Sequence, residues 1–153
     1  MLNHPVQARY LLWSLLALFF LRVLGQIIVV LFSPRWLPPI SQWYSGLLPY
    51  RLLLPIQIAL LFVMGMVCRD VMRGEGFFAV PRSRLGQGLV WFSYIYFSSM
   101  VARYVIQMTL RPDQRWFGGT IPILFHCVLA AFLFVLGSYY VKRLSRRTNK
   151  LAD

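Results

Sequence analysis

Four long apolar runs constrain this chain more than any other feature of its sequence. They cover about residues 11–32, 50–68, 88–110 and 120–141, and each is close to the roughly 20 residues that a helix needs to cross a bilayer. The composition agrees, because 59% of the 153 residues are hydrophobic and only 13% are charged, which excludes an ordinary soluble domain. The sequence therefore predicts an all-α integral membrane protein, an antiparallel four-helix transmembrane bundle that forms a single membrane domain over residues 1–153.

The first run resembles a retained helix more than a cleaved signal peptide. Arg9 precedes the run, and Val23-Leu24-Gly25 could pass as a small-residue cleavage site. An arginine at position 22, directly before that site, and an apolar stretch that continues to Phe32 both favour a helix that stays in the membrane.

The basic residues predict the orientation of the spans. Sixteen Lys or Arg stand against four Asp or Glu, which gives a formal net charge of +12. Four basic residues flank the spans on one side, Arg35, Arg51, Arg111 and Arg115. Ten lie on the side that the termini share, Arg9, Arg69, Arg73, Arg82, Arg84, Lys142, Arg143, Arg146, Arg147 and Lys150. The positive-inside rule then places both termini in the cytoplasm, and we expect a bacterial cytoplasmic membrane and no nucleic-acid partner.

Aromatic and basic residues near the span ends are expected to contact lipid, including anionic headgroups. Residues 33–49 form an outer loop rich in aromatic residues and proline, and two interpretations stay open: a short interfacial helix or an irregular aromatic anchor. Residues 142–153 form a basic cytoplasmic tail. The residues expected at the membrane surfaces are Trp36, Trp43, Tyr44, Trp116, Lys142, Arg143, Arg146 and Arg147.

The two halves of the chain resemble each other. Arg22 and Gln26 match Arg103 and Gln107 as Arg-x-x-x-Gln. Leu54-Pro55-Ile56 matches Ile121-Pro122-Ile123, with each proline expected in the first turn of a helix, and the segment from Ala59 to Gly65 matches that from Ala131 to Gly137. Because apolar alphabets produce chance matches, a duplicated helical hairpin and an accidental likeness both stay open. A true repeat would be parallel, since both hairpins would start on the inside.

Two arginines inside the apolar runs are the most unusual feature. Arg22 falls near the bilayer centre and Arg103 roughly 10 Å below the outer end of its run. A central arginine costs from about 2.5 to more than 10 kcal/mol, depending on how it is measured. All four acidic residues lie outside the runs, so no carboxylate of this chain reaches Arg22.

The remaining partners for these arginines define a candidate ligand or partner-binding site. They are backbone carbonyls, aromatic faces such as Tyr94 and Tyr96, an anionic lipid or ligand, or an acidic residue within the membrane on another subunit. The candidate residues are Arg22, Gln26, Gln57, Arg103, Gln107 and His126. The alternative is structural: the arginines snorkel or bond to carbonyls, and the glutamines and His126 hold helices together.

Motifs for catalysis or metal binding are not recognisable. His126 is the only histidine within a span, so a bis-histidine haem cannot form within one chain, and a His–Met haem would need one of the span methionines, which more often fill space. Paired carboxylates, a Ser-His-Asp order and zinc-ligand spacing are all missing, and we expect no cofactor and no metal.

Three functional hypotheses remain. The first is a non-enzymatic accessory or scaffold subunit of a membrane complex, and the second is a binder or transporter of an anionic amphiphile or lipid that uses the buried arginines. The third and weakest is a redox anchor that contacts quinone or haem through His126 and the tyrosines.

Overall fold

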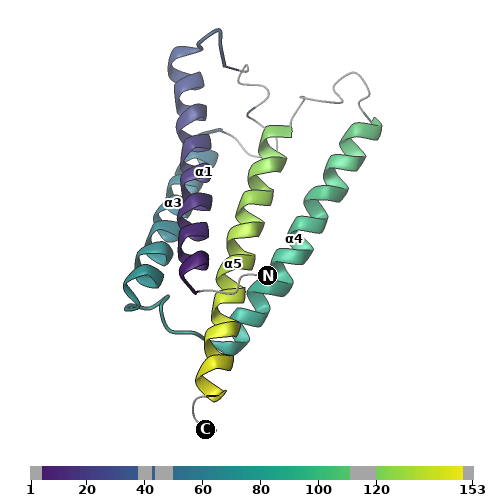
Figure 1. The fold of residues 1–153 in the computed structure, drawn as a ribbon. Coiled ribbons are helices and arrows are strands. Elements are labelled where there is room, and N and C mark those ends of the chain that lie inside the picture. Colours follow the sequence, from purple (N-terminus) through teal and green to yellow (C-terminus); the bar gives the residue numbers. More distant parts are fainter. Residues whose placement is uncertain (1–4, 38–42, 44–49, 111–119, 150–153) are drawn as a thin grey trace.

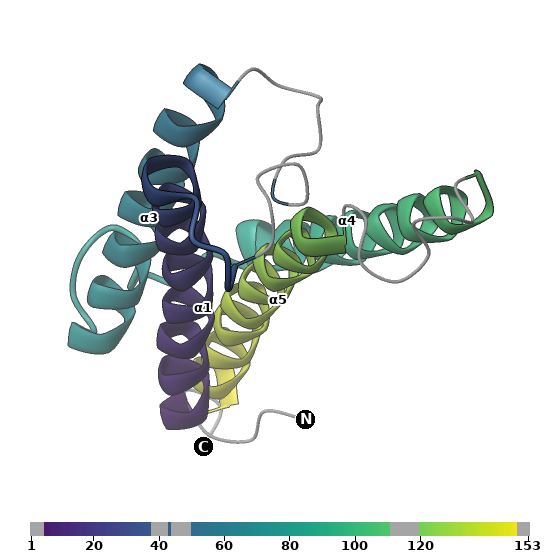
Figure 2. The same cartoon turned by 90° about the horizontal axis from the view of Figure 1, so that it is seen from above.

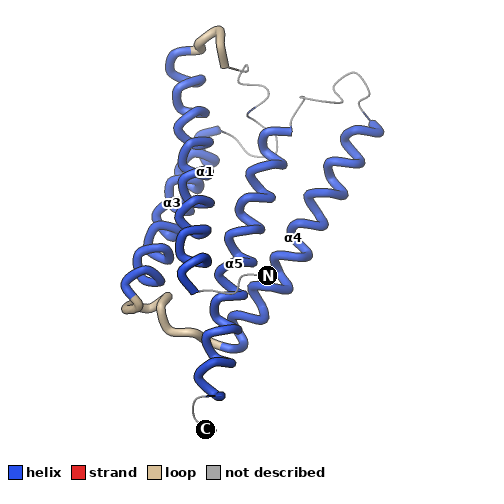
Figure 3. The backbone as a smooth tube through the Cα atoms, in the orientation of Figure 1, coloured by secondary structure: helices blue, strands red, loops and turns tan. Residues whose placement is uncertain are grey.

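The structure, a computed structural model, describes residues 5–37, 43, 50–110 and 120–149. This part is all-helical between its turns and loops (Figures 1 and 3), with α1 over Pro5–Phe32, α3 over Tyr50–Arg73, α4 over Ser83–Leu110 and α5 over Thr120–Asn149. All four helices are long and apolar enough to cross a membrane, as in a multi-pass membrane protein. The prediction of four helices that are long and apolar enough to span a membrane is therefore confirmed. The proposed interfacial helix falls mainly on residues outside the described part.

The helices extend beyond the predicted apolar runs at one end of the structure only. We call the end with Pro5, Arg73, Ser83 and Asn149 the basic end and the opposite one the far end. At the far end the helix limits Phe32, Tyr50, Leu110 and Thr120 coincide with the limits of the apolar runs. At the basic end each helix continues further through polar and basic residues, because arginine and lysine are good helix formers that need not be apolar outside lipid.

The four helices pack as an open row in the order α3, α1, α5, α4. Successive helices run in opposite directions in Figure 1, and within the described part α1 packs on α3 and α5, whereas α4 packs only on α5. Figure 2, seen from above, shows α4 leaning away from the other three. The expected bundle thus does not close, because α3 and α4 do not meet.

The apolar core joins α1, α3 and α5 in the half nearer the basic end. Its fully buried side chains include Leu12 of α1, Cys68 and Val71 of α3, and Tyr140 of α5. Cys68 is a free thiol, as is Cys127. From α4 the core receives only a partly buried Leu89, so most of α4 remains available to lipid or to a partner.

Glycines fix the closest helix approach. A Cβ on Gly137 would lie 2.8 Å from the backbone oxygen of Gly86, so α4 and α5 cross backbone to backbone at this pair. Gly65, which matches Gly137 in the proposed repeat, has no atom within 4 Å of such a Cβ. The matching glycines therefore play different packing roles, whatever the origin of the repeat.

The prolines near the helix starts also differ. Pro122 lies in the first turn of α5, as predicted. Pro55 lies inside α3, one turn later than predicted, because the helix begins at Tyr50. Its missing N–H leaves the carbonyl of Arg51 without its helical donor.

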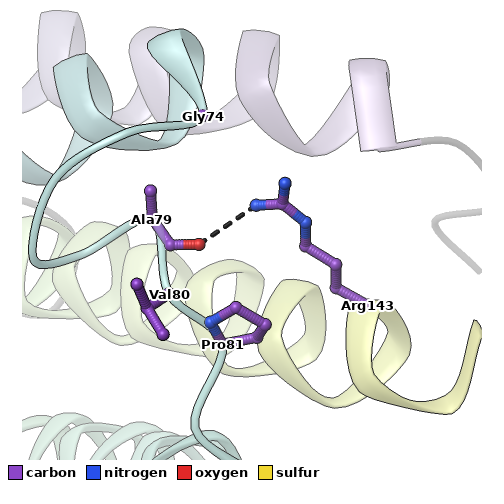
Figure 4. Close-up of a pocket in the computed structure, with 5 residues that line it drawn as sticks. All are labelled: Gly74, Ala79, Val80, Pro81 and Arg143. Atoms are coloured by element: carbon purple, nitrogen blue, oxygen red, sulfur yellow. Dashed lines mark hydrogen bonds between the residues drawn. The ribbon is translucent and has the colours of Figure 1, made fainter. Parts of the chain in front are cut away.

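The connection between α3 and α4 is folded onto α5. Gly74, at φ 76°, ends α3 by donating its N–H to the Asp70 carbonyl at 2.9 Å. Tyr140 of α5 donates to the Phe78 carbonyl at 2.7 Å, and Arg143 donates to the Ala79 carbonyl at 3.0 Å (Figure 4). Side chains of α5 thus donate to two neighbouring carbonyls of the connection, and these hydrogen bonds fix the connection to α5 at the basic end.

Candidate functional site

Polar side chains gather in the half of the structure nearer the far end, beyond the apolar core. Arg22 of α1 is only 6% exposed, and its Nη2 donates to the backbone carbonyl of Trp43 at 3.4 Å. Its guanidinium carbon also lies 5.8 Å from the centre of the Phe125 ring of α5, within range of a cation–π interaction. Arg22 is thus held inside the protein and does not snorkel to the surface.

Gln26 lies one helical turn beyond Arg22 and is fully buried. Neither its amide oxygen nor its amide nitrogen finds a hydrogen-bond partner among the described residues. Gln57 of α3 is 5% exposed, and its Oε1 is likewise unsatisfied there. A buried amide without partners costs on the order of 1–3 kcal/mol, so these two side chains mark a place where polar groups are in excess.

His126 connects α5 to α4. The Tyr96 hydroxyl forms a hydrogen bond of 2.6 Å with Nδ1 of His126, and the two rings meet edge to face at 5.8 Å. Arg103 of α4 and Arg22 of α1 both interact electrostatically with the imidazole of His126. Three helices therefore bring two cations and one histidine to the same region.

The carboxylates of the described residues are far from this region. Asp70 stands near the basic end of α3, where it pairs with Arg69 at 3.3 Å and accepts the N–H of Phe78 at 3.4 Å. Glu75 follows in the adjacent connection. Asp113 and Asp153 lie outside the described residues. In the described part, no carboxylate neutralises the cations near His126.

The predicted site residues are brought together only in part. Arg22, Gln26 and Gln57 are buried, whereas Arg103 and Gln107 of α4 are half-buried and form no hydrogen bond or ion pair within the described part. The two Arg-x-x-x-Gln motifs thus occupy different environments. Of the alternatives left open for Arg22, a backbone carbonyl and an aromatic face are both present; the ring is that of Phe125, not one of the tyrosines given as examples.

Trp43 is placed differently from the anchor expected of it. It is 8% exposed, and its ring covers Gly25, where an added Cβ would lie 2.8 Å from Cη2 of the indole. Sequence reasoning did not assign Trp43 or Phe125 to the arginine environment. The one available signal was Gly25 itself, because a glycine within an apolar helix often permits close approach of another group.

The other membrane-surface residues have mixed outcomes. Trp36 is 79% exposed and Lys142 is exposed, whereas Arg143 bonds to the Ala79 carbonyl and the Tyr139 hydroxyl. Tyr44 and Trp116, and the side chains of Arg146 and Arg147, lie outside the described part.

No group of three His, Cys, Asp or Glu side chains that could hold a metal ion occurs among the described residues. The arrangement instead offers guanidinium, imidazole, hydroxyl and amide groups, which suit an anion with additional hydrogen-bonding atoms. In comparisons with protein-family models, curated proteins and solved structures, the chain matches none of them.

Proposed function

We propose that this protein is a non-enzymatic membrane protein that binds the anionic headgroup of an amphiphile between α1, α5 and α4. Arg22 and Arg103 supply the positive charge, and the Tyr96–His126 pair holds α4 against α5 at the level of the headgroup. One observation carries the proposal: Arg22 is only 6% exposed in the half of the structure where Tyr96 of α4 bonds to His126 of α5 at 2.6 Å, while Asp70 and Glu75 stand at the basic end.

An anion is the natural partner for this arrangement. A guanidinium group that is buried or half-buried in surroundings of low dielectric has lost part of its hydration. A phosphate or carboxylate would supply the opposite charge and accept charge-assisted hydrogen bonds from Arg22 and Arg103. The Trp43 carbonyl and the Phe125 ring, which both contact Arg22, would border such an anion on the side of α1 and α5.

The orientation belongs to the same proposal. Arg69, Arg73, Arg82, Arg84, Lys142 and Arg143 lie at the basic end, which favours this end as the cytoplasmic one. Both termini would then be inside, and the site around His126 would be in the outer half of a bacterial cytoplasmic membrane.

The test uses His126 as a reporter. Protein in neutral maltoside micelles is titrated with dodecyl phosphate, and the ring resonances of His126 are followed by NMR, with His4→Gln used to assign them. We expect the His126 resonances to shift with saturation. The Arg103→Gln variant should weaken binding by about 10-fold to 100-fold, as for the loss of one charged hydrogen bond. Inorganic phosphate alone forms a second titration, which separates a headgroup site from a site for the free ion.

Arg51→Gln is the matched control, because Arg51 is an exposed residue at the far end and its replacement changes the charge by the same amount. Equal affinities of the two arginine variants, or resonances that do not respond to dodecyl phosphate, would refute the headgroup site.

A second candidate function rests on α4. Only Gly86 and Ser93 are buried on this helix, and large side chains such as Phe97 remain exposed along it. An accessory or scaffold subunit would cover this surface with a helix of a partner, and an acidic residue on that helix could pair with Arg103. A stoichiometric partner in mild detergent that dissociates from Phe97→Ala, but not from Phe62→Ala on α3, would favour this function.

A further inference from the structure

We propose that a pocket between α4 and α5 at the basic end binds the headgroup of an anionic phospholipid. This site is separate from the one around His126 and does not depend on it. The pocket has a volume of about 280 Å³. Its lining consists of Gln87, Val90, Trp91, Ser138, Val141 and Lys142.

The crossing of α4 and α5 explains why a pocket forms here. Gly86 and Gly137 allow the two backbones to touch, and a Cβ on Gly137 would also lie 2.9 Å from Cγ2 of Val90. The residues that follow these glycines, Gln87 and Ser138, stand at the edge of the contact. Gln87 and Ser138, together with Lys142, line the pocket beside the Gly86–Gly137 crossing.

The lining combines hydrogen-bond donors with an apolar floor. Lys142 contributes an ammonium group, Gln87 an amide and Ser138 a hydroxyl, while Val90 and Val141 are apolar. None of the lining residues is acidic. Such a set suits a phosphodiester, whose oxygens accept hydrogen bonds, joined to a glycerol and acyl chains that lie on the valines.

The position of the pocket along the helices fits the headgroup layer. Lys142 is the first Lys or Arg in α5, so it marks the end of the apolar part of that helix. Trp91 is 70% exposed, and tryptophans concentrate at the boundary between hydrocarbon and water. A lipid phosphate at this level would be in its normal layer of the membrane, on the side with the most basic residues.

A second pocket at the same end does not offer this chemistry. It has a volume of about 260 Å³ and is lined by Gly74, Ala79, Val80, Pro81 and Arg143 (Figure 4). Arg143 is its only charged lining residue, and its Nη1 already donates to the Ala79 carbonyl and the Tyr139 hydroxyl. The charge of Arg143 thus serves the fold of the connection, and this pocket offers neither an amide nor a hydroxyl side chain beside it.

Native mass spectrometry of the full chain tests the proposal. The protein is released from nanodiscs that contain equal amounts of phosphatidylglycerol and phosphatidylcholine with the same acyl chains. We expect preferential retention of phosphatidylglycerol. The Lys142→Gln variant should lower this preference by about fivefold, the effect of roughly 1 kcal/mol for one lysine near a membrane surface. Arg73→Gln, an equal change of charge on exposed α3 surface, should not alter it.

Ser138→Leu provides a second variant that keeps every charge and fills the pocket. It should reduce the retained phosphatidylglycerol as Lys142→Gln does, whereas Arg103→Gln should leave this retention unchanged because Arg103 belongs to the other site. Equal retention of both lipids by the unmodified protein would overturn the proposal. So would a Ser138→Leu protein that keeps its preference, or an Arg73→Gln protein that loses as much preference as Lys142→Gln.

Discussion

Replacing Gly25 by alanine should displace Trp43 and loosen the environment of Arg22. The added Cβ would lie 2.8 Å from Cη2 and 3.2 Å from Cζ3 of the indole, and a rigid ring so close must move as a whole. The matched control is Gly65→Ala on α3, where nothing lies within 4 Å of the added Cβ. Both substitutions remove a glycine from a helix, which favours the helix by about 1 kcal/mol in each variant. That contribution cancels in the difference between them.

The remaining difference measures the contact with Trp43. Overpacking of a well-packed site costs about 1–3 kcal/mol, so Gly25→Ala should be less stable than Gly65→Ala by that amount. The free energy of unfolding is measured in mixed micelles, and fluorine NMR of protein labelled with 5-fluorotryptophan follows Trp43, assigned through Trp43→Phe. The Trp43 resonance should move in Gly25→Ala and stay in place in Gly65→Ala. If the two variants are equally stable and the resonance does not move, Trp43 does not cover Gly25.

Two further predictions concern single contacts at opposite ends of the structure. Tyr96→Phe removes the hydroxyl that binds Nδ1 of His126 and should lower the free energy of unfolding by about 1 kcal/mol. Tyr94→Phe is the control, because Tyr94 forms no such bond in the described part, and it should leave the free energy of unfolding unchanged. Equal effects of the two substitutions would show that the bond is not formed. Gly76→Ala places a Cβ 2.5 Å from Oδ2 of Asp70 at a φ of 104°. It should destabilise the connection between α3 and α4 by about 1–3 kcal/mol and speed the cleavage of this connection in limited proteolysis. An unchanged cleavage rate would contradict the folded connection.

Part of the candidate site could be predicted from the sequence, because polar and charged residues are rare within an apolar run and are easily recognised there. Arg22, Gln26 and Gln57 stand out as polar residues within spans, and the structure buries all three. Their neighbours could not be predicted in the same way. Phe125 and Trp43 are ordinary aromatic residues in a chain that has many, and only the packing of α5 and of residue 43 on α1 brings them to Arg22.

The sequence by itself determined the number of the helices, the length of their apolar parts and their far-end limits. Hydropathy is a sum over neighbouring residues, and a bilayer requires a nearly constant length of apolar chain, so local composition is sufficient. The far-end limits of α1, α3, α4 and α5 follow directly from where apolar residues give way to polar ones, proline or glycine.

Only the tertiary structure decided which helix faces pack together. In a membrane the surfaces towards lipid and towards protein are both apolar, so no polar stripe marks the outside of a helix. The open row, the exposure of α4 and the Gly86–Gly137 crossing therefore leave no plain periodic signal in the sequence. They depend on the fit of particular side chains across helices, which a pattern along one chain does not contain.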